Sequence, residues 1–189
     1  MTMPSKSKVI EYWKERIFEK GFFIDWGEPS CWACGEFWNG RYDINGTYAS
    51  YKKILNAWEK APLQRCHIVP VSLGGNQDES NLFLMCKQCH DLAPNTSFTE
   101  IFFQWAQNQN YIKRFNQQIL QCREDFDIPE ELLFELLKTS ATKKFEEFLH
   151  RHAGLHWPQS GYSGLGKRLT LSTFVGLLLY YYNNKHSKA

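Results

Sequence analysis

Four of the six cysteines stand in two short pairs of the same spacing. The pairs are Cys31-x-x-Cys34 and Cys86-x-x-Cys89. Each pair can clamp one side of a tetrahedral zinc ion, and two such pairs complete a structural site when the fold brings them together. The alternative is that these residues are buried thiols or a redox pair. The doubled spacing and an expected reducing compartment favour Zn²⁺.

The segment between and within these pairs predicts short elements that carry further chemistry. Residues 65–70 (RCHIVP) read as a strand that the proline ends, and the double glycine at 74–75 opens a loop. Residues 81–85 (NLFLM) read as a second strand, and residues 86–90 (CKQCH) as the start of a helix. Three side chains able to move a proton or hold a metal fall on these elements in turn: His67, Asn81 and His90.

This order of elements resembles the HNH endonucleases of the ββα-metal class, in the variety that carries a CxxC…CxxC zinc knuckle. The residues that carry the resemblance are His67-Ile68-Val69-Pro70, Gly74-Gly75, Asn81-Leu82 and Cys86-x-x-Cys89-His90. The likeness covers roughly residues 31–95, and it is specific because several elements occur in the right order. It implies an α+β fold with a small zinc-stapled ββα core and cleavage of phosphodiester bonds in double-stranded DNA.

The resemblance also implies roles for three residues. His67 would be the general base that takes a proton from the attacking water, because a neutral imidazole can accept a proton near neutral pH. His90 would help to hold a divalent cation, Mg²⁺ or a similar ion, that neutralises charge on the phosphate. Asn81 would ligate that cation or brace the loop that positions His67. The zinc at the four cysteines would be structural.

One position departs from the family pattern, because many members place Asp where this chain has Cys66. A thiol is a poor ligand for Mg²⁺. Three interpretations are open: Cys66 faces the core while His90, Asn81 and a DNA phosphate hold the cation; Cys66 joins a site for Mn²⁺, Zn²⁺ or another softer ion; or the centre does not cut. The presence of the other family positions favours the first two. Asp78 and Asp91 are neighbouring carboxylates that can substitute.

The distribution of charge says more about partners than the formal net charge of +2. After Glu147 the chain has no Asp or Glu, yet it carries five basic residues: Arg151, Lys167, Arg168, Lys185 and Lys188. Such a stretch fits a surface that faces phosphates, and it fits a solvated tail equally well. We expect nucleic-acid contacts at three residues: Arg65, Lys167 and Arg168.

Three other patterns resemble binding sites but have a simpler structural explanation. Residues 161–168 (GYSGLGKR) resemble a P-loop, but Arg168 occupies the Ser/Thr position and no strand precedes them, which predicts a basic loop. His150, His152 and His156 fit the solvated end of a helix better than a metal cluster. Four tryptophans can stack on bases, although we expect most of them in the core: Trp32, Trp38, Trp58 and Trp105.

The flanking segments predict helices. Residues 7–20 place apolar side chains at helical spacing, and Gly21 is a stop signal. Residues 128–152 repeat apolar side chains every four residues, which predicts one long helix. The most apolar run, residues 169–182, is shorter than the ~20 residues that cross a bilayer, so it predicts a docked helix and a candidate homodimer interface.

The expected organisation has three parts: an N-terminal helical segment (1–30), a zinc-knuckle HNH core (31–95) and a helical C-terminal region (96–189) for DNA contact or dimerisation. The start of the chain shows no secretory signal, so we expect a cytoplasmic protein without a membrane partner. The hypothesis is a metal-dependent DNA endonuclease of restriction, of phages or mobile elements, or of defence. The alternatives are a zinc-dependent nucleic-acid-binding module that has lost cleavage and, less favoured, a protein–protein adaptor.

Overall fold

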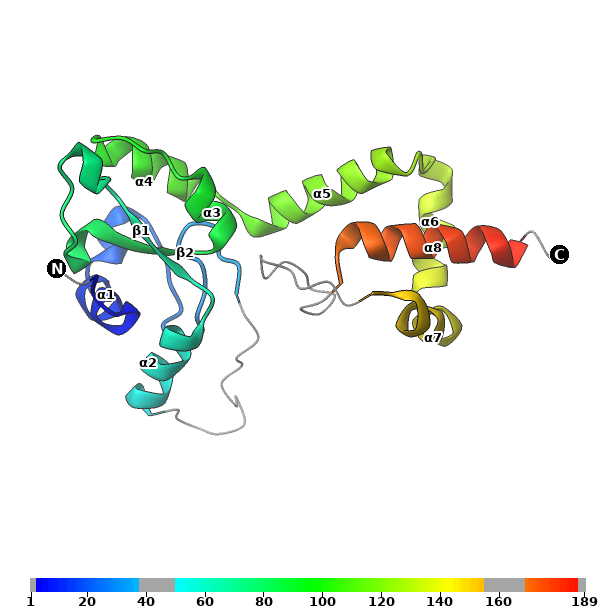
Figure 1. Ribbon diagram of the computed structural model, residues 1–189, viewed down its shortest axis with the longest axis horizontal. Coiled ribbons are helices and arrows are strands. Elements are labelled where there is room, and N and C mark those ends of the chain that lie inside the picture. Colours follow the sequence, from blue (N-terminus) through cyan, green and yellow to red (C-terminus); the bar gives the residue numbers. More distant parts are fainter. Residues whose placement is uncertain (1–2, 38–49, 155–168, 187–189) are drawn as a thin grey trace. The chain divides into compact units, whose positions relative to one another are not determined.

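The computed structural model of the chain describes residues 3–37, 50–154 and 169–186 (Figure 1). The chain divides into two compact units, Met1–Tyr111 and Ile112–Ala189. The boundaries expected from the sequence at residues 30 and 95 both fall inside the first unit. Within the described residues, no helix combines the length and the apolar character needed to span a bilayer.

The N-terminal segment folds as the sequence predicts, into a helix followed by a tighter turn. Helix α1 spans Lys6–Trp13, and the 3₁₀ turn η1 spans Ile17–Lys20. The Ser5 hydroxyl caps α1 by accepting a hydrogen bond from the Lys8 N–H (3.3 Å). Gly21 ends the turn with a left-handed backbone, φ 79°. The apolar positions of this segment are all buried: Val9, Ile10, Trp13 and Ile17.

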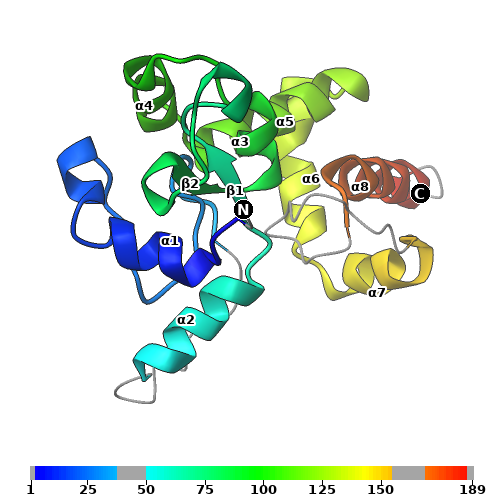
Figure 2. The same cartoon turned by 60° about the vertical axis from the view of Figure 1, so that its left-hand side comes forward.

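A strand–loop–strand–helix unit lies at the centre of the first unit and confirms the predicted ββα order. Its elements are β1 (Gln64–His67), the 3₁₀ turns η2 (Val71–Leu73) and η3 (Glu79–Asn81), β2 (Leu82–Met85) and α3 (Lys87–Leu92). The two strands pair antiparallel, with Cys66 opposite Phe83. Helix α3 packs beside both strands (Figures 1 and 2). The fold therefore places His67 at the end of β1 and His90 on the neighbouring helix.

Aromatic side chains fill the core around Phe83. Its ring meets the rings of Trp32, Phe22 and Phe102 edge-on, at centroid distances of 5.1, 5.2 and 5.6 Å. Phe102 comes from helix α4 (Thr99–Gln107). Edge-on pairs of this kind add about 0.5–1.5 kcal/mol each beyond the burial of their area. The core is thus large for so short a sheet, because flanking helices contribute to it.

The tryptophans behave as expected where the structure describes them. Trp32 and Trp58 are buried, and Trp105 is half-buried against the same core. Trp38 lies outside the described residues. Trp13 is more than a core residue, because its Nε1–H donates to the carbonyls of Leu82 (2.8 Å) and Glu79 (2.9 Å). It thereby ties α1 to the start of β2.

Helix α2 (Tyr51–Lys60) is tied to the first turn of α1 by two polar contacts. Oε1 of Glu59 accepts hydrogen bonds from the backbone N–H (2.8 Å) and the hydroxyl (2.6 Å) of Ser7. In return, the Lys6 ammonium donates to the backbone carbonyls of Glu59 (3.1 Å) and Ala61. A carboxylate at a helix N-terminus is favourable because it meets unpaired N–H groups and the positive end of the helix dipole.

We expect Glu59→Gln to weaken the first unit in a pH-dependent way. Burial raises the pKa of Glu59, but the hydrogen bonds from Ser7 and the interactions with Lys6 together outweigh it and leave the pKa below its usual value. The pKa of Glu59 is thus lower in the folded state than in the unfolded state, so its ionised carboxylate stabilises the fold at pH values above the unfolded-state pKa. This stabilisation is lost as the pH falls through the folded-state pKa. The free energy of unfolding should drop by about 0.5 kcal/mol at pH 7, allowing for solvent screening. Denaturant unfolding of both proteins from pH 7 down to pH 3 measures the difference, which should stay nearly constant above about pH 4.5 and shrink below it. A difference that stays constant down to pH 3 would contradict it.

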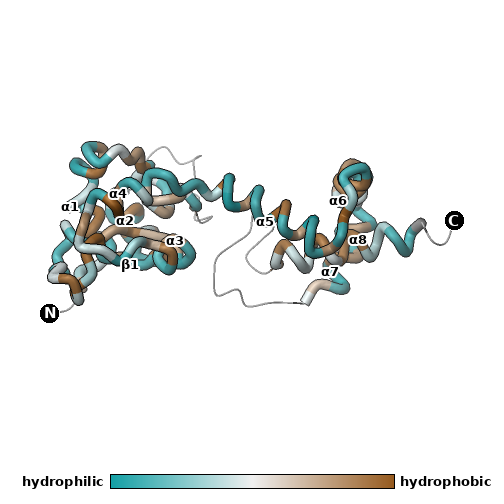
Figure 3. The backbone as a smooth tube through the Cα atoms, turned by 90° about the horizontal axis from the view of Figure 1, so that it is seen from above, coloured by the Kyte–Doolittle hydropathy of each residue, from teal (hydrophilic) through white to brown (hydrophobic). Residues whose placement is uncertain are grey.

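The second unit is helical throughout its described residues. Its elements are α5 (Tyr111–Asp125), which begins at the last residue of the first unit, the 3₁₀ turn η4 (Glu130–Leu132), α6 (Leu133–Ser140), α7 (Lys143–His152) and α8 (Leu171–His186). Helix α8 packs against α6 and α7. The most buried apolar residues are Ile128, Leu136, Phe145 and Leu178. Figure 3 shows that α8 becomes more polar toward its C-terminal end.

The single helix predicted for residues 128–152 is wrong, because the chain breaks between α6 and α7. Thr142 caps α7 by accepting a hydrogen bond from the Phe145 N–H (3.3 Å), and its hydroxyl is 2.8 Å from the Thr139 carbonyl. A spacing of four residues drifts around a helix of 3.6 residues per turn. Leu137, which an unbroken helix would place in the buried row, is 68% exposed. The break lets Phe145 reach the core.

Candidate metal and catalytic site

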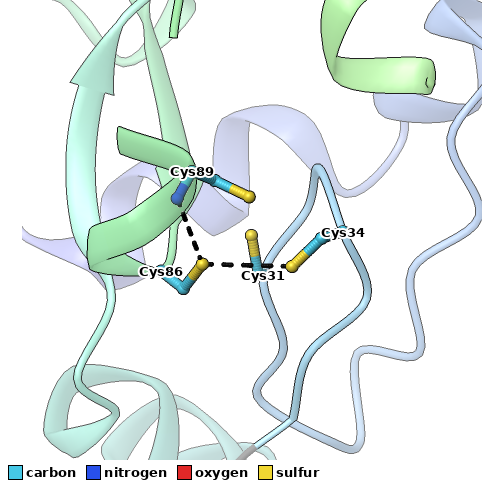
Figure 4. A group of neighbouring side chains, drawn as sticks. All are labelled: Cys31, Cys34, Cys86 and Cys89. Carbon is cyan, nitrogen blue, oxygen red and sulfur yellow. Dashed lines mark hydrogen bonds between the residues drawn. The ribbon is translucent and has the colours of Figure 1, made fainter. Parts of the chain in front are cut away.

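The four paired cysteines meet in one cluster, as the spacing predicts (Figure 4). Their Sγ atoms all lie within 4.8 Å of one another, and all four residues are buried. The Sγ atoms of Cys34 and Cys86 are 3.9 Å apart. Tetrahedral zinc with Zn–S bonds of about 2.3 Å separates its sulfur ligands by about 3.8 Å. The cluster therefore has the composition and the size of a structural zinc site.

Backbone hydrogen bonds hold the first cysteine pair in a tight turn beside the sheet. The N–H of Cys31 donates to the carbonyl of Glu36, and the N–H of Gly35 donates to that of Cys31, both at 2.8 Å. Gly35 has φ 75°, which favours a residue without a Cβ. The N–H of Trp32 donates to the Leu84 carbonyl of β2 (2.9 Å), so the turn is fixed to the strand that leads to the second pair.

The second pair is positioned by the junction of β2 and α3. Cys86 caps α3, and its Sγ accepts a hydrogen bond from the Cys89 N–H (3.3 Å). Burial raises the pKa of Cys31, whereas a hydrogen bond with Cys31 is the main cause that lowers the pKa of Cys86 to about 6. A thiolate inside this cluster is thus stabilised by its neighbours. Because zinc binds thiolates rather than thiols, this environment suits the metal.

His67 lies at the end of β1 with one ring nitrogen turned inward. Its Nε2 is buried and has no hydrogen-bond partner within the described part of the chain. Burial lowers the pKa of His67, and the charge of His90 lowers it further. The imidazole is therefore mostly neutral at pH 7, which is the form that accepts a proton.

His90 lies on α3 beside a carboxylate. Its Nδ1 is 3.6 Å from Oδ1 of Asp91, whose other oxygen pairs with the Lys87 ammonium. The hydrogen bond with Lys87 is the main cause that lowers the pKa of Asp91. Of the two carboxylates considered from the sequence, Asp91 is thus the one found next to a family histidine. Asp78 instead accepts a hydrogen bond from the side chain of Asn76 within the loop.

Asn81 braces the loop that follows His67. Its Oδ1 accepts a hydrogen bond from the Val69 N–H (2.9 Å), and its Nδ2 donates to the carbonyls of Val69 and Asn76, both at 2.8 Å. Bracing is one of the two roles that the resemblance implies. Because Oδ1 is engaged by Val69, cation ligation by Asn81 would compete with this contact.

Cys66 faces the core. It is 6% exposed, belongs to the same apolar cluster as the strand opposite it, and its Sγ is 3.6 Å from the His67 carbonyl. Burial raises its pKa to about 12, so it is a thiol at neutral pH. This position argues against the second interpretation, in which Cys66 joins a cation site, and it agrees with both the first and the third. The sequence signal for this position is the alternation of side chains between the two faces of a strand. It puts Cys66 and the buried Ile68 on one face and His67 on the other.

Of the three expected nucleic-acid contacts, Arg65 lies on β1, two residues before His67, and the other two lie outside the described residues. One N–H of the Arg65 guanidinium donates to the Pro4 carbonyl (2.7 Å), so contact with DNA would have to use its other N–H groups. Lys167 and Arg168 fall in the undescribed segment, and so does His156. His150 and His152 are exposed at the end of α7. Among the described residues, the cysteine cluster is the one group of three or more His, Cys, Asp and Glu side chains placed to share a metal ion.

Replacing Gly75 by alanine is expected to disturb the loop beside His67. An added Cβ would lie 1.9 Å from the Val69 carbonyl oxygen and 2.8 Å from Nδ2 of Asn81, so the backbone would have to move. We expect a loss of about 1–3 kcal/mol in the free energy of unfolding. Thermal unfolding measures it. The matched control is Gly74→Asn, because Gly74 has open space around it and asparagine tolerates its φ of 90°. Equal melting of the two variants would contradict the close approach at Gly75.

An antiparallel pair of strands, the helix that follows it and the four-cysteine cluster beside them form one ββα unit, which carries His67 at the end of β1 and His90 on α3. Residues 57–95 match the family model described as HNH endonuclease. The match confirms, for these residues, the resemblance to HNH endonucleases predicted from the sequence. The first cysteine pair precedes the matched residues. No curated protein and no solved structure gives a significant match to the chain.

Proposed function

We propose that the chain is a metal-dependent endonuclease that hydrolyses phosphodiester bonds of double-stranded DNA. The observation that carries the proposal is the HNH match over residues 57–95, together with His67 and His90 on adjacent elements of one ββα unit. His67 acts as the general base, and the zinc at the cysteines holds the fold without entering the reaction.

The orientation of His67 decides which nitrogen takes the proton. Because Nε2 is buried, Nδ1 is the ring nitrogen that an attacking water can reach. The lowered pKa of His67 keeps the imidazole neutral at neutral pH, and Nδ1 accepts the proton in the tautomer that carries its hydrogen on Nε2. The water gives its proton to Nδ1 as its oxygen attacks phosphorus, which leaves 5′-phosphate and 3′-hydroxyl ends. The brace from Asn81 keeps the loop after His67 in place during this step.

His90 is the side chain best placed to hold the catalytic cation. A bound Mg²⁺ or similar ion supplies positive charge to the phosphate and to the leaving oxygen. The buried thiol of Cys66 does not serve it, so hard oxygen ligands come from the DNA phosphate, from water and from Asp91 beside His90. One such centre cuts one strand, so cleavage of both strands requires two copies, as in a homodimer, or two successive nicks.

A second candidate function is a zinc-dependent nucleic-acid-binding module that does not cleave. The observation that favours it is that Cys66 replaces the family's carboxylate and lies in the core. This module would bind zinc and DNA as the proposed nuclease does. It would differ only in lacking the proton transfer at His67.

Incubation of the purified chain with supercoiled plasmid in Mg²⁺, Mn²⁺, Ni²⁺ or Zn²⁺ tests the proposal. We expect nicked circles in at least one of these ions, and we expect a ligase to seal them because the ends are 5′-phosphate and 3′-hydroxyl. A chain with one zinc bound that nicks in none of the four ions would overturn the enzyme proposal in favour of the binding module. Nicking would point to an intracellular role in restriction, in mobile-element transfer or in defence.

A further inference from the structure

The ends of α7 and α8 in the second unit share an exposed surface of aromatic and basic side chains. We call it the aromatic–basic surface. Ring contacts connect its rings, Phe148, His152 and Tyr180. Its exposed polar residues lie within about one helical turn of these rings or of Tyr181 along the two helices: Arg151, Asn184 and Lys185. Ring contacts join the two helices here, because Phe148 of α7 packs against Tyr180 and Tyr181 of α8.

Three rings of this surface form a continuous stack that reaches solvent. The His152 ring lies 4.3 Å from the Phe148 ring at 35°, and the Phe148 ring lies 6.3 Å from the Tyr180 ring at 13°. His152 is exposed, and Tyr180 is 60% exposed. Helix packing needs the inner ring but does not explain why a tyrosine and a histidine present their rings to water at both ends of the stack. Exposed rings of this kind can stack on bases or sugars.

The charged residues at the C-terminal ends of the two helices are cationic, and the nearest acidic residue along α7 is Glu147. Arg151 and Lys185 are exposed, and Asn184 donates its side-chain N–H to the Tyr180 carbonyl (2.8 Å), which places it one turn beyond that ring. Glu147 lies one turn before Arg151, whose Nε–H donates to the backbone carbonyl of Glu147 (3.2 Å). No acidic residue follows Glu147 in the sequence. Cations with interleaved aromatic rings are the footprint of a nucleic-acid contact.

We propose that the aromatic–basic surface binds the DNA backbone, with Arg151 and Lys185 on phosphates and Tyr180 against an adjacent sugar or base. This inference rests on the proposed function for its ligand, DNA, and it assigns a DNA contact to the second unit. The positive charge of this surface favours DNA, a polyanion, as its ligand. A second copy of the chain docked through the same surface would bring two cationic surfaces together.

Fluorescence anisotropy with labelled duplex and single-stranded DNA tests the contact. The full-length chain carries His67→Ala so that the DNA is not cut in Mg²⁺. We expect Arg151→Ala with Lys185→Ala to weaken duplex binding about tenfold at 0.1 M salt and to reduce the slope of log K against log salt by about 2. Tyr180→Ala should weaken single-stranded binding about fivefold. The matched control is Lys138→Ala, an exposed lysine of the same unit that is paired with Glu135 (2.9 Å), and it should leave both constants unchanged.

Unchanged affinity and salt slope in the double variant would overturn the proposal, and so would an equal loss in the Lys138→Ala control. Dissociation of a dimer with unchanged DNA affinity would overturn it too and would make this surface a contact between copies. These outcomes are separate from the failure of the nuclease function. A chain that binds DNA through this surface but never nicks plasmid would overturn the proposed nuclease function and would leave the DNA contact standing.

Discussion

Replacing Cys34 by serine is expected to abolish zinc binding and to unfold the first unit. The four sulfur atoms lie within 4.8 Å of one another in a buried cluster, and the loss of one ligand leaves three buried thiols without a shared metal. Zinc bound at such sites contributes about 10–16 kcal/mol to folding at pH 7 in small peptides. Whole domains are stable by only about 5–15 kcal/mol. Metal analysis and thermal unfolding measure the two effects.

The matched control for Cys34→Ser is Cys122→Ser. Cys122 is buried in the second unit, with its Sγ 3.8 Å from the hydroxyl oxygen of Ser172, so a serine there keeps a polar neighbour. We expect it to retain one zinc per chain and a melting temperature near that of the wild type. A Cys34→Ser variant that lacks zinc and still melts like the wild type would show that the aromatic core around Phe83 holds the unit without the metal.

Replacing His67 by alanine is expected to lower the rate of plasmid nicking by about 10²–10⁴-fold, the usual range for a general base. The side chain lies at the end of β1, and no hydrogen bond of the described residues depends on its buried Nε2. The variant should therefore keep its fold, its zinc and its affinity for DNA while it loses the proton acceptor. Nicking rates under single-turnover conditions measure the effect on the chemical step.

The matched control for His67→Ala is His150→Ala, because His150 is an exposed histidine of α7 in the other unit. We expect its nicking rate to equal that of the wild type. Equal losses in the two variants would trace the effect to a general change in the protein and not to a base at position 67.

Local sequence signals predicted most of the elements and the two cysteine pairs because their causes are local. The CxxC spacing, the period of apolar residues in α1 and the glycine after η1 each act over a few residues. The 51 residues between Cys34 and Cys86 carried no such information about how the two pairs meet. Their meeting depends on long-range contacts, such as the hydrogen bond from Trp32 to Leu84.

The role of Asn81 needed the tertiary structure, whereas strand alternation already indicates the position of Cys66. An asparagine beside a strand can ligate a metal or bind the backbone, and only the position of Val69 and Asn76 shows that both of its amide groups are engaged. Side chains alternate between the two faces of a strand, and this alternation along β1 predicts the core-facing position of Cys66. The break at Thr142 was missed because a threonine inside a helical pattern can equally begin a new helix.

The measurement that tests the role of His67 most directly is the ratio of nicking rates of the wild type and of His67→Ala, in the same divalent cation and at one zinc per chain. We expect the wild type to nick supercoiled plasmid and the variant to be slower by at least about 10²-fold. Equal rates in preparations with equal zinc content would contradict the assignment of His67 as the general base.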